Sequence, residues 1–252
     1  MSLPFVSARG NRGGTFAAGP AAPAASEASV TRQDDLDHWW KLGSVSAEIG
    51  ADFTVSGDGV LFTGDGGHNG EKAFDTSEGS VQLDGSNDYL FAESIAGWEL
   101  AYPFTMTFWA RVPSAGSLLG MFTVMDGTSK SYADLNGFLN HGVFSAYVDL
   151  SAASTGTQTV VADTWFFLTQ SYDGSVVKRY KAQKGTDSDP TAFASYSSVS
   201  YTAAIASGHN SIYVGEGPWG SMEGNVDDVR VYGAALPLDD LKLIYNGGDG
   251  DY

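Results

Sequence analysis

The sequence predicts an all-β fold in which two antiparallel sheets pack as a sandwich. Short apolar runs recur along the chain, and Gly, Asp, Asn and Ser separate them, which is typical of strands joined by turns. The chain also contains 32 glycines and 13% aromatic residues, a composition that favours many turns around a packed sheet interior. Its 252 residues fit one large sandwich domain.

Taken in order, the apolar runs predict about a dozen strands. They cover residues 38–42, 59–64, 80–85, 88–93, 103–112, 117–127, 137–150, 164–174, 175–182, 211–216 and 225–233. Alternation is strongest in PFTMTFWARV, where Phe104 and Met106 fall on one face and Trp109 on the other. A Tyr-Asp-Gly-Ser turn joins 164–174 to 175–182 and predicts a hairpin.

One short helix is predicted near the C-terminus, in LPLDDLKLIYNGG. Leu238, Leu241 and Tyr245 fall near one face at helical spacing. Pro237 stands early and Gly247 follows the end, as helix boundaries favour. This helix is expected to close the sandwich.

Residues 1–33 differ from the remainder of the chain and are expected to form an extended arm. They are rich in Gly, Ala, Pro and Ser and lack periodicity, so alone they cannot bury enough apolar area to offset the entropy of ordering. We therefore divide the chain into this arm and a sandwich domain over residues 34–252. A partner subunit is the simplest means of holding the arm.

The charge of the chain excludes several classes of partner. There are 30 Asp and Glu residues against 13 Lys and Arg, a formal net charge of −17. A surface this acidic repels nucleic acid and anionic lipid.

The absence of cysteine excludes disulfides and thiolate chemistry. No apolar run is long enough for a membrane span or a secretory signal, so we expect synthesis in a cytosol without classical export.

Five segments occur together in a characteristic order. They are GSVQLDGSNDYLFAE, FTMTFWARV, TWFFLTQSYDGSVVKRY, IYVGE and GNVDDVRVYGAALPLDDLKLIYN. In this order they resemble the laminin-G-like group of concanavalin A-like lectin and glucanase jelly rolls, over residues 38–246. The resemblance implies a jelly-roll sandwich with a structural Ca²⁺ ion at its edge. Two segments depart from the family pattern, AQKGTDSDP and ADFTVSGDG.

Two adjacent aspartates, Asp227 and Asp228, interrupt the alternating run NVDDVRVYG. Because neighbouring strand residues point to opposite faces, Asp227 is expected to share a face with Val229 and Val231, towards the core. Asp228 then shares a face with Arg230, and we expect it at the surface or in a cross-strand pair.

Two explanations for Asp227 stay open. In the first, it ligates the Ca²⁺ ion that the family resemblance implies, and carboxylates from loops between the early strands complete the shell. Those candidates are Asp52, Asp58, Asp65 and Asp75. In the second, its carboxylate is buried and satisfied by backbone N–H groups or by an arginine such as Arg111 or Arg230.

The sequence predicts a protein that is not an enzyme. Glucanases of the family that the chain resembles use paired carboxylates in a Glu-x-Asp-x-x-Glu pattern, which is absent. The motifs of serine hydrolases and phosphate loops are absent as well. The four histidines lack metal-ligand spacing and are interpreted as surface or hydrogen-bonded residues: His38, His68, His141 and His209.

Tryptophans in loops are the candidate glycan contacts, because sugars pack on aromatic faces beside polar groups. Trp219 lies in EGPWGSMEGN and Trp98 in IAGWEL. A loop anchor or a subunit contact is the competing interpretation of Trp219. Trp39 and Trp165 are interpreted as core residues, and the alternation allows Trp109 an outer face.

The favoured hypothesis is a non-enzymatic structural protein of a virion. The start of the arm, MSLPFVSARGNRGG, is similar to N-terminal arms of tailed-phage virion proteins. The arm would dock into a neighbouring subunit of a homo-oligomer on a phage head or tail, and the jelly roll would face outward towards host glycans. The alternative is a free, extracellular, lectin-like carbohydrate-binding module of a microbe. A glycoside hydrolase is the third possibility.

Overall fold

The computed structural model describes residues 33–42, 49–50, 53–56, 60–63, 79–101, 103–114, 118–126, 135–140, 143–148, 151–153, 160–174, 176–192, 208–218 and 220–246. The predicted arm lies outside this set except for its last residue, Gln33. Over these ranges the chain is all-β apart from one 3-10 turn (Gln33–Asp35) and one α-helix, α1 (Leu238–Tyr245), which confirms the predicted fold class. Neither of these two helical segments has the length and apolar character that a membrane span requires.

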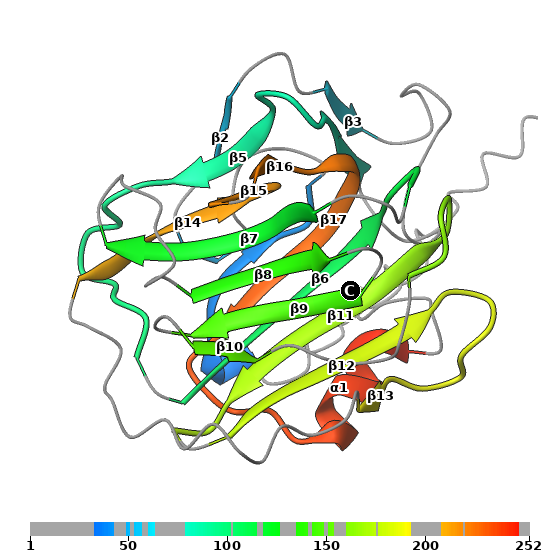
Figure 1. Ribbon diagram of the computed structural model, residues 1–252. Helices are drawn as coiled ribbons and strands as arrows, with labels where there is room; N and C mark the ends of the chain where they lie inside the picture. Colours follow the sequence, from blue (N-terminus) through cyan, green and yellow to red (C-terminus); the bar gives the residue numbers. More distant parts are fainter. Residues whose placement is uncertain are drawn as a thin grey trace, which may run out of the picture.

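Two antiparallel sheets face each other as the layers of a sandwich (Figure 1). The eight-stranded sheet has the order β13-β12-β11-β6-β17-β4-β3, with β1 paired to β17. Its strands are β1 (Leu36–Trp40), β3 (Val60–Thr63), β4 (Gly79–Asp84), β6 (Phe104–Arg111), β11 (Trp165–Tyr172), β12 (Val177–Gln183), β13 (Thr191–Ala192) and β17 (Glu223–Tyr232).

The seven-stranded sheet has the order β10-β9-β8-β7-β14-β5-β2. Its strands are β2 (Thr54–Ser56), β5 (Tyr89–Ala92), β7 (Leu118–Asp126), β8 (Leu135–Asn140), β9 (Val143–Val148), β10 (Ser151–Ala153) and β14 (His209–Val214). The run 137–150, expected as one strand, is divided between β8 and β9. The chain reverses there, since Asn140 pairs with Val143 across a short connection that contains a glycine.

A short hairpin of β15 (Glu216–Gly217) and β16 (Gly220–Ser221) packs against β7. The approach is close because β7 has a glycine at the contact. A Cβ atom on Gly120 would lie 2.3 Å from the backbone nitrogen of Gly217. The hairpin is fastened by the hydroxyl of Thr123, which donates a hydrogen bond to the carbonyl oxygen of Glu216 (3.0 Å).

The main core lies between the two sheets. On β6, the inward-facing residues follow the predicted alternation and are at most 2% exposed: Phe104, Met106, Phe108 and Ala110. The ring of Phe108 meets that of Phe122 on β7 edge-on, with 5.4 Å between centroids. Removing this apolar area from water is the dominant favourable contribution to folding.

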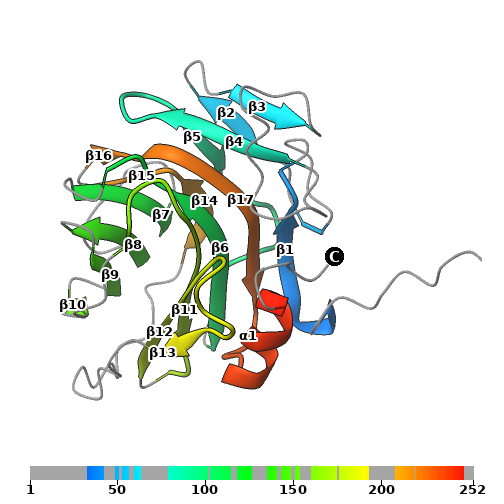
Figure 2. The ribbon, with the colours of Figure 1, turned by 90° about the vertical axis from the view of Figure 1, so that its right-hand side faces the viewer.

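A second apolar cluster covers the outer face of the eight-stranded sheet. Trp109 and Phe167 lie on that face, and Tyr245 of α1 packs on both, at centroid distances of 5.5 and 5.8 Å. Figure 2 shows α1 on the side of this sheet that faces away from the seven-stranded sheet. The predicted helix is confirmed, but its C-cap is Asn246, in a left-handed conformation (φ 48°), one residue before the predicted Gly247.

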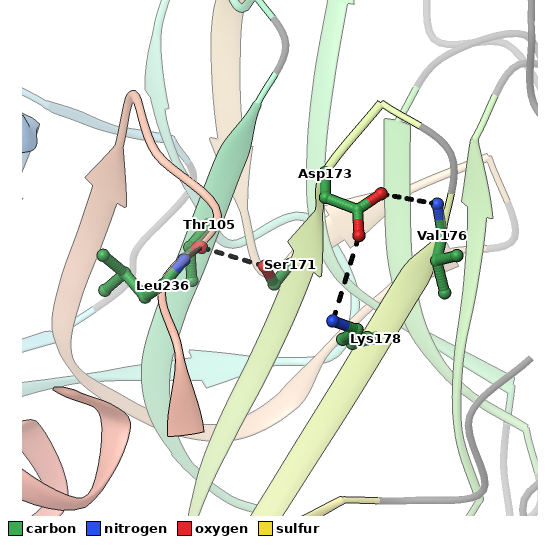
Figure 3. Close-up of polar contacts among 6 residues, drawn as sticks. All are labelled: Thr105, Ser171, Asp173, Val176, Lys178 and Leu236. Atoms are coloured by element: carbon green, nitrogen blue, oxygen red, sulfur yellow. Dashed lines mark hydrogen bonds and ion pairs between the residues drawn. The ribbon is translucent and has the colours of Figure 1, made fainter. Parts of the chain in front are cut away.

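The hydroxyl of Thr105 fastens the segment that leads into α1 to the sheet (Figure 3). It accepts a hydrogen bond from the N–H of Leu236 (2.9 Å) and donates one to the carbonyl oxygen of Ala234 (2.7 Å). It also lies 3.1 Å from the hydroxyl of Ser171 on β11. One buried side chain therefore links two strands to the approach to α1.

The predicted hairpin between β11 and β12 is confirmed, with Tyr172 paired to Val177 next to the turn. The carboxylate of Asp173 accepts a hydrogen bond from the N–H of Val176 (2.8 Å) and lies 3.9 Å from Nζ of Lys178 (Figure 3). An aspartate that bonds the backbone three residues on is a common way to stabilise such a turn.

A β-bulge interrupts β17 at the two adjacent aspartates. The register against β6 shifts between Asp227 and Arg230, so Asp228 is an extra residue, with a φ of 43°. The extra residue reverses the alternation. Asp227 stands opposite Trp109 and therefore lies on the outer face of the sheet. The prediction that Asp227 shares a face with inward valines such as Val229 is wrong.

Asp228 is fully buried, contrary to the expected surface position. Its Oδ1 accepts hydrogen bonds from Nε1 of Trp39 (2.7 Å) and Nε of Arg230 (2.9 Å). The guanidinium also lies 4.7 Å from the centre of the Trp39 ring. Burial opposes the charge of Arg230, but the carboxylate of Asp228 outweighs it and raises the pKa of Arg230 above its ordinary value.

The bulge marks the point at which β17 changes its neighbour. Residues before the bulge, Glu223–Val226, pair with β4, and residues after it, Val229–Tyr232, pair with β1. β1 thus joins the sheet beside the second half of β17. This arrangement brings Asp37 and His38 to an edge of the sandwich.

Candidate functional site

β1 and the segment that follows β5 enclose an open cleft of about 690 Å³. Asp37, His38 and Gly50 form one side, and residues 91–98 form the other. Because β1 belongs to the eight-stranded sheet and β5 to the seven-stranded sheet, the cleft lies between the two sheets. Its volume falls in the range of sites that hold small molecules.

Trp98 forms a half-buried wall of the cleft. Its backbone N–H bonds the carbonyl oxygen of Ile95 (3.3 Å), which closes a turn in which Gly97 has a φ of 78°. The indole Nε1 donates a hydrogen bond to Oδ2 of Asp37 (3.1 Å). The ring of His38 meets the indole edge-on, with 4.6 Å between centroids. These contacts hold the indole in one orientation.

A ladder of aromatic rings supports the cleft from the core. His38 stacks on Trp40 at 5.3 Å between centroids, and Trp40 stacks on Phe53 at 3.8 Å. Trp40 and Phe53 belong to the buried core between the sheets. Because these rings are packed on one another, the floor beneath Trp98 is rigid.

Asp37 lies at the side of the cleft with its carboxylate partly withdrawn from water. Burial raises the pKa of the Asp37 carboxyl, the hydrogen bond from Trp98 lowers it, and the charge of Asp35 adds to the rise. Burial prevails, so Asp37 titrates above the ordinary range of an aspartate.

His38 was predicted as a surface or hydrogen-bonded histidine, and its exposure of only 2% rules out the surface alternative. Burial lowers the pKa of the His38 imidazole to about 4, which leaves the ring uncharged at neutral pH. Gly50 packs directly against it. A Cβ atom at Gly50 would lie 1.9 Å from Nδ1 of His38, and the φ of Gly50 is 94°. This position therefore requires glycine.

The opposite side of the cleft carries Phe91 and Glu93. Phe91 is half-buried and stacks with Tyr213 of β14 at 5.8 Å between centroids. The hydroxyl of Tyr213 donates a hydrogen bond to Oε1 of Glu93. Ser94 follows with a φ of 51°, and its N–H donates to the hydroxyl of Ser211 (2.8 Å). These bonds tie the wall to β14.

The chemistry of the cleft is that of fixed aromatic rings beside hydrogen-bond acceptors. Its two acidic side chains are Asp37 and Glu93, and among the described residues that line it there is no Lys or Arg. Carboxylates accept hydrogen bonds and donate none when ionised. The cleft therefore suits a ligand that has hydroxyl donors and an apolar face.

Of the two tryptophans predicted as glycan contacts, the structure places Trp98 in the cleft. Trp219 lies outside the described residues, between the strands of the β15–β16 hairpin. The alternation of β6 is borne out for Trp109, which lies on the outer face under Tyr245.

Of the predicted metal ligands, Asp227 is the one that lies among the described residues. Asp227 is buried, and its Oδ1 accepts a hydrogen bond from the N–H of Asp228 (2.8 Å). This contact matches the second explanation, a buried carboxylate satisfied by the backbone. Asp52, Asp58, Asp65 and Asp75 lie outside the described residues. Among those described, no three His, Cys, Asp or Glu side chains gather as a metal site.

Asp37, His38 and Glu93 were not predicted as site residues. Asp37 stands just before the strand predicted at 38–42, and Glu93 ends the strand predicted at 88–93. A polar residue at the end of a strand is a weak signal for a site. The missing information is the pairing of β1 with β17, which brings these two strand ends together.

No family model and no curated protein matches the sequence. Solved structures match the fold at low identity. Domain 4 of AbnA, a GH43 extracellular arabinanase from Geobacillus stearothermophilus in complex with arabinotriose, is 14% identical, with a TM-score of 0.54; the match covers 82% of this chain and 97% of that one.

Two larger proteins contain a similar sandwich. The binding domain of botulinum neurotoxin serotype D is 14% identical with a TM-score of 0.57, and the match covers 87% of this chain and 53% of that one. Trypanosoma rangeli sialidase is 12% identical with a TM-score of 0.60, and the match covers 85% of this chain and 33% of that one. At such identities the likeness concerns the β-sandwich fold.

Proposed function

We propose that this chain is a non-enzymatic carbohydrate-binding module whose binding site is the cleft between β1 and residues 91–98. The observation that carries the proposal is the indole of Trp98, which Asp37 and His38 hold in one orientation at the wall of an open cleft. A fixed ring lets a sugar pack without a further loss of side-chain entropy. The carboxylates of Asp37 and Glu93 supply acceptors for the sugar hydroxyls.

The fold comparisons support this proposal without assigning a sugar. The matched arabinanase domain is in complex with arabinotriose, and the matched toxin segment is a binding domain. Both use a sandwich of the kind found here. Because one fold hosts many functions, the assignment depends on the residues of the cleft.

Binding of a panel of oligosaccharides that includes arabinotriose, measured by glycan array and titration calorimetry, tests the proposal. We expect Trp98→Ala to lower the affinity of any bound sugar at least about tenfold, since a fixed aromatic contact is lost. Trp165→Ala is the matched control, because Trp165 is also half-buried but does not line the cleft. Retained binding in Trp98→Ala, or no binding by the unaltered protein, would sink the proposal.

Trp219 is the second predicted glycan contact, and Trp219→Ala belongs in the same panel. In the sequence it stands between β15 and β16, and it lies outside the described residues. A loss of binding in Trp219→Ala alone would move the site to the hairpin. A change in oligomeric state would instead favour the competing interpretation as a subunit contact.

The absence of catalysis is part of the proposal, and a glycoside hydrolase is the alternative. Hydrolysis needs one carboxyl group as acid and a second as base or nucleophile. In the cleft, Asp37 is bonded to Trp98 and Glu93 to Tyr213, so both carboxylates hold positions within the wall. Release of reducing ends from oligosaccharides incubated with the protein, lost in Asp37→Asn, would establish the alternative.

The larger role that we propose is display of this module on a virion, with residues 1–33 docked into a neighbouring subunit of a homo-oligomer. Its support is the composition of the arm and its similarity to phage arms. The location would then be the particle, with an extracellular free module as the alternative. Incorporation into particles, compared between the full chain and a variant that lacks residues 1–33, distinguishes the virion subunit from the free module.

A further inference from the structure

We propose that the cleft selects uncharged sugars and excludes anionic ones, such as sialic and uronic acids. This inference rests on the proposed carbohydrate-binding function and adds the class of sugar. Its basis is the polar groups of the wall: two carboxylates, Asp37 and Glu93, and no basic side chain among the described residues that line the cleft.

His38 cannot serve as a cationic partner for an acidic sugar at neutral pH. Among the described residues that line the cleft, it is the one side chain that can carry a positive charge. The residue is 2% exposed and its ring packs against Trp40 and Trp98, so burial disfavours an imidazolium. Binding a sugar carboxylate next to it would leave that charge without a counter-ion.

The two carboxylates of the wall are held in place, so neither can swing away from a like charge. Trp98 donates its indole N–H to Oδ2 of Asp37 at 3.1 Å, and Tyr213 donates its hydroxyl to Oε1 of Glu93. Each carboxylate has further lone pairs, with which a sugar hydroxyl can form a hydrogen bond, whereas an ionised sugar carboxylate has no proton to donate. Like charges repel more strongly beside a half-buried carboxylate such as that of Asp37 than they do in bulk water.

Three main-chain N–H groups of the wall already have acceptors within the protein. The N–H of Ser94 already donates to the hydroxyl of Ser211 (2.8 Å), and those of Ile95 and Trp98 donate to the carbonyl oxygens of Asn210 (2.9 Å) and Ile95 (3.3 Å). The formal charge of −17 on the whole chain adds a repulsive field that salt weakens.

The test compares neutral and anionic sugars of matched length. The neutral probes are lactose and arabinotriose, and the anionic probes are sialyllactose and trigalacturonic acid, titrated calorimetrically at low and high salt. We expect the unaltered protein to bind a neutral probe at least about tenfold more tightly than any anionic one, with the ratio shrinking at high salt.

Variants locate the selectivity in the cleft. Asp37→Asn and Glu93→Gln keep the size of the side chain, remove one charge each and replace one acceptor oxygen by an amide donor, and they should raise the ratio of anionic to neutral affinity several-fold. Asp239→Asn on α1 is the control: its side chain is 92% exposed, and it alters net charge equally without touching the cleft.

The outcomes distinguish a failure of the proposed selectivity from a failure of the proposed carbohydrate-binding function. If no probe binds, both the binding module and its selectivity are wrong. If anionic probes bind as tightly as neutral ones, the selectivity is wrong and the binding module stands. If Asp239→Asn changes the ratio as much as Glu93→Gln does, the selectivity arises from net charge and not from the wall of the cleft.

Discussion

At the scale of single residues, the ion pair of Asp228 and Arg230 places two charged side chains in the interior of the protein. Both side chains are 0% exposed, and Nε of Arg230 lies 2.9 Å from Oδ1 of Asp228. Taking two charges out of water is costly, and their attraction together with the bond from Trp39 offsets that cost. The pair therefore matters most when one partner is removed.

We expect Asp228→Asn to lower the free energy of unfolding by about 3–5 kcal/mol, because it leaves the charge of Arg230 buried without its counter-ion. Asparagine tolerates the left-handed conformation at this position, so the change isolates the charge from the backbone. Urea unfolding measures the effect. Asp239→Asn, with its exposed carboxylate, should change stability by no more than about 0.5 kcal/mol. Equal effects in the two variants would contradict the prediction.

His38 gives the fold a pH dependence. The unfolded chain protonates this residue near pH 6.5, whereas burial lowers the pKa of folded His38 to about 4. Between these values the unfolded state binds more protons, so the free energy of unfolding falls as the pH is lowered from 6.5 to 4, by up to about 3 kcal/mol.

Unfolding in urea between pH 4 and 7.5 checks this expectation, with His38→Gln as the variant that lacks the titration. Asp37 acts in the opposite direction, because its pKa is raised on folding and its contribution is lost as the pH rises through that raised value. The slope of stability against pH should therefore be shallower in His38→Gln and steeper in Asp37→Asn. Identical slopes in His38→Gln and the unaltered protein would refute the assignment.

At the scale of elements, hydrogen bonds near both ends of α1 hold this helix on the outer face of the eight-stranded sheet. Thr105 accepts from Leu236 and donates to Ala234, directly before the helix begins. Tyr245 then anchors the far end, since its hydroxyl donates to the carbonyl oxygens of Asp187 (2.8 Å) and Gln183 (3.2 Å). A helix of eight residues has little stability of its own, so these contacts hold it on the sheet.

We expect Thr105→Val to destabilise the protein by about 1–3 kcal/mol, because the buried N–H of Leu236 loses its acceptor. Thr105→Ser keeps the hydroxyl and should recover most of the loss. Hydrogen exchange of the Leu236 amide reports the local opening directly. Unchanged exchange in Thr105→Val would show that the hydroxyl is not what holds this segment.

At the scale of the whole molecule, we expect the sandwich and the predicted arm to be separable. Among the described residues, the two apolar clusters that hold the sandwich together begin at Leu36. We expect deletion of residues 1–32 to leave the melting temperature within a few degrees and to abolish assembly of the oligomer, as measured by calorimetry and light scattering. An arm-free protein that still assembles would contradict the proposed docking.

The predicted Ca²⁺ site would also join distant parts of the chain, because its candidate ligands come from separate loops and from β17. A bound ion stabilises the folded state by mass action, so we expect millimolar Ca²⁺ to raise the melting temperature and EDTA to lower it. Asp227→Asn should remove the response if Asp227 is a ligand. An unchanged melting temperature in both solutions would contradict the Ca²⁺ prediction. The role of Asp227 would then be to accept the hydrogen bond from the N–H of Asp228 in the bulge.

The sequence by itself determined the fold class, most strand positions and the C-terminal helix. The alternation of side chains along a strand and the residues that favour turns depend only on a few neighbouring residues. The folded protein keeps the pattern that they predict, since Phe104 and Met106 both lie on the inner face of β6. Trp98 was predicted as a glycan contact for a similar local reason, since a large ring in a Gly-containing loop has no strand face to occupy.

Only the tertiary structure decided the faces of Asp227 and Asp228 and the composition of the cleft. One inserted residue reverses every later side chain of a strand, and alternation alone does not show where a bulge lies. The bond between Trp98 and Asp37 joins residues 61 positions apart, one in the segment that follows β5 and the other on β1. Such contacts arise from how the layers pack, a property of the whole chain that no local pattern contains.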